Sequence, residues 1–131
     1  MIDNSYLDWP FLEDSHRILA KDFSSWAEQE IAPISNTEPQ TDGELDSLAI
    51  ELVRRLAGGG WLKYCVVSPW GGYYEKLDVR ALCLMREILA QHCGMADFSF
   101  VMQGLGTGPI SLFGTDEMKK NIFLMSLKEN A

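Results

Sequence analysis

The sequence MADFSFVMQGLGTGPISLFGTDEMKK, residues 95–120, has no charged side chain between Asp97 and Asp116, although 23% of the whole chain is charged. So long an uncharged run predicts a segment that is enclosed by protein. Gly104, Gly106, Gly108 and Pro109 interrupt the run, so one uniform helix is not expected. A buried and interrupted segment of this kind is a candidate wall of a ligand site.

The first half of this stretch can be read as a strand or as a helix. As a strand, Phe98, Phe100 and Met102 alternate with other residues, and the following GLGTGP suggests a dinucleotide-binding turn. The third glycine of G-x-G-x-x-G would fall on Pro109, so the spacing fails. Apolar residues three and four apart favour a helix instead. We therefore expect a helix, a break at 106–108, and a short second helix over 109–114.

Two helices are predicted ahead of this stretch. The first begins with Asp8 as its cap and Pro10 in its first turn, and it ends near Ile31 because Pro33 follows. The second begins with the capping-box pair Thr41 and Glu44, and three glycines at 58–60 end it. Each helix has an apolar stripe at helical spacing, formed in the first by Leu12, Leu19, Phe23 and Trp26, and in the second by Leu45, Leu48, Leu52 and Leu56.

Two more helices complete the predicted fold. One begins at Asp78 and is apolar on most sides. The last begins at Thr115 as its cap, with Met118, Ile122 and Met125 on one face. The sequence therefore predicts an all-α fold, an orthogonal or up-down bundle of about five to six helices in one domain.

Composition excludes several classes of function. A net charge of −8 and the lack of a basic cluster argue against nucleic acid as a partner. The three cysteines show no C-x-x-C spacing, so neither a disulfide framework nor a metal site is expected. No signal peptide or membrane span is expected, which predicts a cytoplasmic protein. Motifs such as H-E-x-x-H, G-x-S-x-G and the P-loop are absent, and His16 and His92 are isolated in the sequence.

The order of several strings resembles the N-terminal helical domain of the acyl-CoA dehydrogenase family. LVRRLAGGGWLKYCVVSPWGG, residues 52–72, resembles that family's helix, glycine stop, apolar link and P-x-x-GG turn. GPISLFGTDEMKK, residues 108–120, resembles its G-P-I turn and the start of its closing helix. The likeness extends from about Phe11 to the end of the chain.

The resemblance implies an FAD-dependent oxidoreductase of fatty acid metabolism, in which a glutamate removes the α-proton of an acyl-CoA and the β-hydride passes to the flavin. In that family the flavin-contacting (A/L)-x-(S/T)-E-P motif and the glutamate belong to the other two domains, and neither motif occurs here. We therefore expect residues 1–131 to be the N-terminal part of a three-domain homodimer or homotetramer. Alone they are expected to be inactive, with no catalytic residue and with the main FAD contacts elsewhere.

The resemblance also implies a role for the stretch quoted first, because this part of the family lines the acyl-chain cavity. By position it assigns seven residues to the cavity wall: Phe98, Val101, Met102, Leu105, Gly106, Gly108 and Pro109. Bulky Val101 and Met102 would shorten the cavity, unless these side chains pack only against other helices. The alternative function is a stand-alone helical module that binds an apolar ligand or serves as a scaffold, without catalysis.

Overall fold

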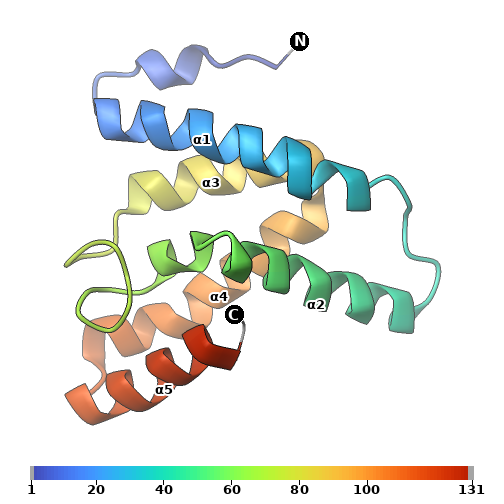
Figure 1. Ribbon diagram of the computed structural model, residues 1–131. Helices are drawn as coiled ribbons and strands as arrows, with labels where there is room; N and C mark the ends of the chain where they lie inside the picture. The colour runs from blue at the N-terminus through green and yellow to red at the C-terminus, as the bar shows by residue number, and fades with distance from the viewer. Residues whose placement is uncertain (1, 130–131) are drawn as a thin grey trace.

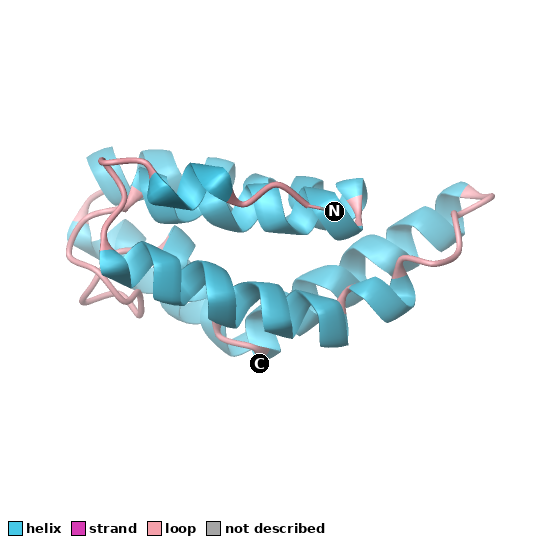
Figure 2. Ribbon diagram, turned by 90° about the horizontal axis from the view of Figure 1, so that it is seen from above, coloured by secondary structure: helices cyan, strands magenta, loops and turns pink. Residues whose placement is uncertain are grey.

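The chain folds into a helical bundle. The computed structural model describes residues 2–129, with side chains through Phe123. Helices joined by loops make up this part, which contains no strand and only an isolated bridge between Val67 and Tyr74 (Figure 2). The elements are η1 (Ser5–Asp8), α1 (Asp14–Glu30), η2 (Ala32–Ile34), α2 (Asp42–Gly58), η3 (Trp61–Cys65), α3 (Val79–His92), α4 (Gly94–Phe113) and α5 (Asp116–Glu129). The predicted all-α class is confirmed.

The helices run back and forth along one long direction (Figure 1). α1 packs chiefly on α3, α3 packs on α4, and α4 also contacts α2, η3 and α5. The helices α1 to α4 contribute buried side chains to one core, among them Phe23, Leu52, Leu56, Met85 and Leu89. None of the described helices is both long and apolar enough to cross a membrane.

Side-chain caps begin three of the helices as the sequence predicts. The Thr41 hydroxyl accepts a hydrogen bond from the backbone N–H of Glu44 at 3.2 Å. Asp78 accepts from the N–H of Arg80 at 3.0 Å, and Thr115 accepts from that of Met118 at 3.2 Å. These groups satisfy backbone donors that the first turn of a helix leaves free, which explains why the local sequence locates these helix starts.

The predicted start of the first helix at Asp8 is wrong. Residues 5–8 form the short helix η1, and α1 begins only at Asp14, with Glu13 as its N-cap. The chain between them folds over α3 and buries Leu12, so this leucine packs from a loop. His16 stabilises the later start, because its Nδ1 accepts the N–H of Glu13 at 2.9 Å.

His16 is isolated in the sequence but not in the fold. It is 2% exposed, and its Nε2 lies 2.7 Å from Oδ2 of Asp78, 62 residues away. Since Nδ1 accepts from Glu13, Nε2 carries the proton and donates it to the Asp78 carboxylate. The pair ties the first turn of α1 to the cap of α3, and neither residue was predicted to have this role.

The predicted break at 106–108 is also wrong, since α4 runs without interruption through Pro109. Proline removes one backbone hydrogen bond from a helix. The neighbouring turn of α4 is held against η3. The Thr107 hydroxyl lies 2.8 Å from the carbonyl oxygens of both Cys65 and Gln103. The segment predicted as a separate helix over 109–114 is therefore the end of α4, which stops at Gly114.

The prediction that residues 95–120 are enclosed by protein is wrong as well. Several large apolar side chains of α4 face solvent, and in α5 the buried contact is Phe123. Met118 and Ile122, predicted to share an apolar face, are 47% and 37% exposed, and the side chain of Met125 lies outside the described residues. An uncharged run thus marks an apolar surface here, and not an enclosed segment.

The link between α2 and α3 folds tightly over aromatic rings. Trp61 packs edge-on against Phe23 of α1, with ring centroids 4.7 Å apart, and Tyr64 contacts both Tyr73 and Tyr74. Gly72 lies so close to the backbone of Val66 that a Cβ at position 72 would overlap its carbonyl oxygen. This packing fixes η3, on which α4 rests.

Candidate functional site

α4 presents a long apolar surface to solvent, which we call the α4 apolar face. Leu105 is 62% exposed and Phe113 is 87% exposed, which is unusual for side chains of this size. Four members are spaced by four, three and seven residues and so share one side of the helix, and the fifth, Phe113, adjoins Leu112. They are Phe98, Met102, Leu105, Leu112 and Phe113. A continuous apolar face of this kind marks a binding or interaction surface.

The structure distributes the predicted site residues along α4 and does not gather them in one cavity. Phe98 and Met102 border a groove of about 410 Å³ shared with α2. Val101 and Leu105 border a smaller groove, of about 240 Å³, shared with α3 and η3. α4 is thus a ridge between two grooves. The remaining predicted residues lie beyond both grooves: Gly106, Gly108 and Pro109.

The glycines of α4 leave bare backbone on this ridge. A Cβ added at Gly106 or Gly108 would have no atom within 4 Å, and one at Gly104 would meet only the Cys65 sulfur at 3.9 Å. Glycine inside a helix costs about 1 kcal/mol relative to alanine. No packing contact within the described fold requires glycine at these positions. The exposed backbone would therefore allow a ligand or another domain to approach α4 closely.

Two polar contacts hold the ridge in place. The guanidinium of Arg86 on α3 forms a forked pair with Asp97 in the first turn of α4, through bonds of 2.7 and 2.9 Å. At the other end, Thr107 is bonded to the Cys65 carbonyl of η3. A forked arginine–carboxylate pair fixes orientation as well as distance. These contacts therefore fix the position of α4 relative to α3 and η3.

The α4 apolar face offers binding without acid–base chemistry. Ser99 and Ser111 are buried, and their hydroxyl oxygens have no hydrogen-bond partner among the described atoms. Burial raises the pKa of Cys65, beneath the ridge, to about 12, so its thiol stays neutral. Within the described residues, no three His, Cys, Asp or Glu side chains gather where they could hold a metal ion.

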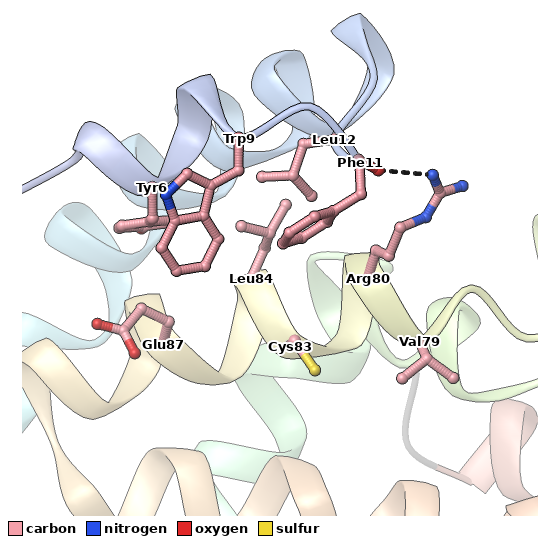
Figure 3. Close-up of a pocket in the computed structure, with 9 residues that line it drawn as sticks. All are labelled: Tyr6, Trp9, Phe11, Leu12, Val79, Arg80, Cys83, Leu84 and Glu87. Atoms are coloured by element: carbon pink, nitrogen blue, oxygen red, sulfur yellow. Dashed lines mark hydrogen bonds between the residues drawn. The ribbon is translucent and has the colours of Figure 1, made fainter.

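A second concave site lies between the N-terminal segment and α3 (Figure 3), beside the smaller groove, with which it shares Val79 and Cys83. We call it the N-terminal cavity; it measures about 390 Å³. Aromatic rings of the N-terminal segment and apolar side chains of α3 line it, and Arg80 and Glu87 lie at its edges: Tyr6, Trp9, Phe11, Leu12, Val79, Arg80, Cys83, Leu84 and Glu87. Its size is within the range of small-molecule pockets.

Sequence reasoning missed the N-terminal cavity because it placed residues 9–12 inside a helix. The available signal was the density of large rings, Tyr6, Trp9 and Phe11, in an otherwise polar and acidic segment. Rings clustered outside any apolar stripe indicate a surface feature more than a core.

Comparison with known families identifies the whole fold. Residues 13–127 match the family described as acyl-CoA dehydrogenase, N-terminal domain. No curated protein matches the chain significantly. The family match spans α1 through most of α5 and includes the α4 ridge, whereas residues 2–12 of the N-terminal cavity lie outside it.

Proposed function

Because the chain belongs to the acyl-CoA dehydrogenase family through its N-terminal domain, we propose that residues 1–131 are the N-terminal helical domain of an FAD-dependent acyl-CoA dehydrogenase. Such an enzyme introduces a double bond between the α and β carbons of an acyl-CoA thioester. The observation that carries the proposal is the α4 apolar face, uncharged between Asp97 and Asp116 and exposed over most of its length. An acyl chain is apolar, so it matches this face.

In this proposal the chain contributes a wall and no reacting group. Val101 and Leu105 would contact the acyl chain from one side of the ridge, and Phe98 and Met102 from the other. The bare backbone at Gly106 and Gly108 would let a flat or extended group approach closely. A wall of this kind excludes water, which strengthens the electrostatic interactions that acidify the α-carbon of the substrate.

The described residues fit an apolar part of the cofactor or substrate, and they do not fit the whole of FAD. The pyrophosphate of FAD needs cations or clustered backbone donors, and α4 carries no basic side chain from Gly94 to Phe113. We therefore assign no FAD-holding residue in this chain and derive no step through the flavin. The flavin contacts and the catalytic base would belong to the remaining domains of the enzyme.

The exposed face also supports the proposed partners. A surface with Leu112 at 68% and Phe113 at 87% exposure is costly to leave in water. In a complete enzyme, other domains and a homodimeric or homotetrameric assembly would cover it. We expect the 131-residue chain by itself to be colourless, to lack acyl-CoA-dependent dye reduction, and to self-associate in analytical ultracentrifugation.

The test uses the polypeptide encoded by the whole reading frame that contains this chain. It is purified and assayed for bound FAD and for dye reduction with straight-chain acyl-CoA esters of increasing length. Leu105→Ala removes bulk from the proposed wall, so it should shift the preferred ester toward longer chains. Ile18→Ala, which removes an exposed apolar side chain of α1 outside both α4 grooves, serves as the control and should leave the preference unchanged.

Absence of both flavin and acyl-CoA-dependent activity in that polypeptide would overturn the proposal. It would favour the alternative of a non-catalytic helical binding module or scaffold. Activity with an unchanged chain-length preference in Leu105→Ala would keep the enzyme assignment and reject the proposed cavity wall.

A further inference from the structure

The N-terminal cavity has a roof of aromatic rings and a floor of apolar side chains. Trp9 lies between Tyr6, with ring centroids 6.4 Å apart, and Phe11, at 5.5 Å, and the three rings are tilted against one another. Figure 3 shows the rings of Trp9 and Phe11 directed toward α3, above Leu84 and Cys83. Such an arrangement offers both ring faces and ring edges to a bound group.

The rings are not needed to complete the core of the domain. Trp9 is 53% exposed and Phe11 is 56% exposed, and Val79 below them is 66% exposed. Only Leu12 and Leu84 in this lining are buried, and they anchor the segment to the bundle. The cavity therefore leaves large apolar area open to water, which is the usual state of a site that another molecule covers.

The charges around the cavity are unequal. Arg80, at one edge, donates to the Phe11 carbonyl at 2.8 Å and is paired with Asp78 and Glu13. Glu87, at the opposite edge beside Tyr6, forms no ion pair with any described residue. The one cation in the lining is thus neutralised locally, while the one carboxylate is free.

The surroundings of the cavity increase this negative character. Residues 2–14 contain Asp3, Asp8, Glu13 and Asp14 and no basic side chain, and the chain as a whole carries a net charge of −8. Arg17 of α1 donates to the Leu7 and Leu12 carbonyls of this segment, but its charge is paired with Asp14. Arg86, which precedes Glu87, is held by Asp97 in the forked pair. Cations attracted to this surface would therefore meet aromatic rings beside a free carboxylate, the combination that binds organic cations in proteins.

We propose that the N-terminal cavity is a binding site for a small organic cation, an ammonium group on an apolar body. The apolar body lies between the rings of Trp9 and Phe11 and the floor at Leu84, and the ammonium group faces Trp9, Tyr6 and Glu87. A volume of about 390 Å³ accommodates a ligand of this size. The proposal does not rest on the acyl-CoA dehydrogenase function, because it is argued from the N-terminal rings and Glu87. The two sites are neighbours, since Val79 and Cys83 of α3 line both this cavity and the smaller groove beside α4.

Phenylpropylammonium, phenylpropanol and phenylpropanoate test the proposal, because they share one apolar body and differ in charge. Each is titrated into the ¹⁵N-labelled polypeptide encoded by the whole reading frame while the backbone and tryptophan indole N–H signals are recorded by NMR. We expect the ammonium compound to cause saturable shifts at Trp9, Cys83, Leu84 and Glu87. It should bind more tightly than the alcohol, and the carboxylate should bind most weakly.

Three variants localise the effect. Glu87→Gln should weaken binding of the ammonium compound roughly two- to five-fold and leave binding of the alcohol unchanged. Glu75→Gln removes an exposed carboxylate outside the cavity lining and should change neither compound. Trp9→Ala should weaken the ammonium compound about ten-fold or more, because both the ring face and apolar contact are lost. Circular dichroism checks that each variant keeps its helical content.

Several results would overturn the proposal. If the alcohol binds as tightly as the ammonium compound, the cavity recognises only apolar surface. If the carboxylate binds most tightly, Arg80 governs the site. An absence of saturable shifts in the wild-type chain excludes the site, and equal effects of Glu87→Gln and Glu75→Gln exclude the assigned role of Glu87.

Discussion

Replacing Asp78 with alanine should destabilise the domain by about 2–4 kcal/mol, because one carboxylate performs two tasks. It caps α3 through the N–H groups of Arg80 and Ala81, and loss of such a cap costs about 1 kcal/mol. It also accepts the proton of buried His16, and a buried donor left without an acceptor costs about 1–3 kcal/mol. The two losses share one side chain, so their sum is an upper range.

Urea unfolding followed by circular dichroism measures this change. Asp78→Asn keeps one acceptor oxygen, which cannot serve both the helix cap and His16. It should therefore lower the free energy of unfolding by about 1–2 kcal/mol, less than Asp78→Ala does. The control is Asp46→Ala, because Asp46 is an exposed residue of α2 that forms no ion pair among the described residues. Its free energy of unfolding should stay within about 0.5 kcal/mol of the wild-type value. If Asp78→Ala is no more harmful than the control, the bond between His16 and Asp78 does not stabilise the fold as argued.

The pH dependence of the same variants gives a second check. Burial opposes ionisation of Asp78, but hydrogen bonds from His16 and the Ala81 N–H, together with the charge of Arg80, outweigh it and hold the pKa below the ordinary value of 3.8. A carboxyl whose pKa is lower in the folded state contributes stability above its unfolded pKa and loses it as pH falls through the folded pKa. The difference in unfolding free energy between wild type and Asp78→Ala should therefore shrink below about pH 4. If the difference in unfolding free energy between wild type and Asp78→Ala grows as the pH falls, the hydrogen bonds assigned to Asp78 are contradicted.

Three further substitutions and one chemical modification test other parts of the fold. Gly106→Ala should stabilise the chain by about 0.5–1 kcal/mol in urea unfolding, since the added methyl group meets no atom, whereas Gly72→Ala should cost about 3 kcal/mol or more because of backbone overlap. At about pH 8.5, iodoacetamide should modify exposed Cys83 and leave buried Cys65 unmodified until the chain unfolds, as mapped by mass spectrometry; the pKa of Cys65, about 12, accounts for the contrast. Phe23→Ala should cost about 3–5 kcal/mol and lower the melting temperature, because a fully buried ring leaves a cavity.

Local signals in the sequence were sufficient for much of the fold. Thr41, Asp78 and Thr115 begin helices because a side-chain oxygen satisfies donors two or three residues away, and this relation is visible in a short window. Leu52 and Leu56 are fully buried as their spacing indicates. Local signals also failed in places: the cap predicted at Asp8 does not begin α1, and Leu45, predicted in the same stripe as Leu52, is 37% exposed.

Long-range contacts account for what the sequence could not provide. His16 and Asp78 are 62 residues apart, and no periodic pattern relates them. α4 continues through Pro109, and Thr107 of the same helix reaches the carbonyl of Cys65 across the bundle. The residues predicted for the cavity wall do lie on one helix, but the position of that helix between two grooves follows from packing against α2, α3 and η3.

The pairing of α1 with α3, across the whole of α2, has a consequence for the order of folding. α3 and α4 are adjacent in sequence and joined by the Arg86–Asp97 pair, so they can associate by closing a short loop. α1 must wait for a partner about sixty residues later, as the His16–Asp78 separation shows. On the ribosome, the stripe that contains Phe23 is therefore made first and buried late, and during that interval it is the part of the nascent chain most in need of a chaperone.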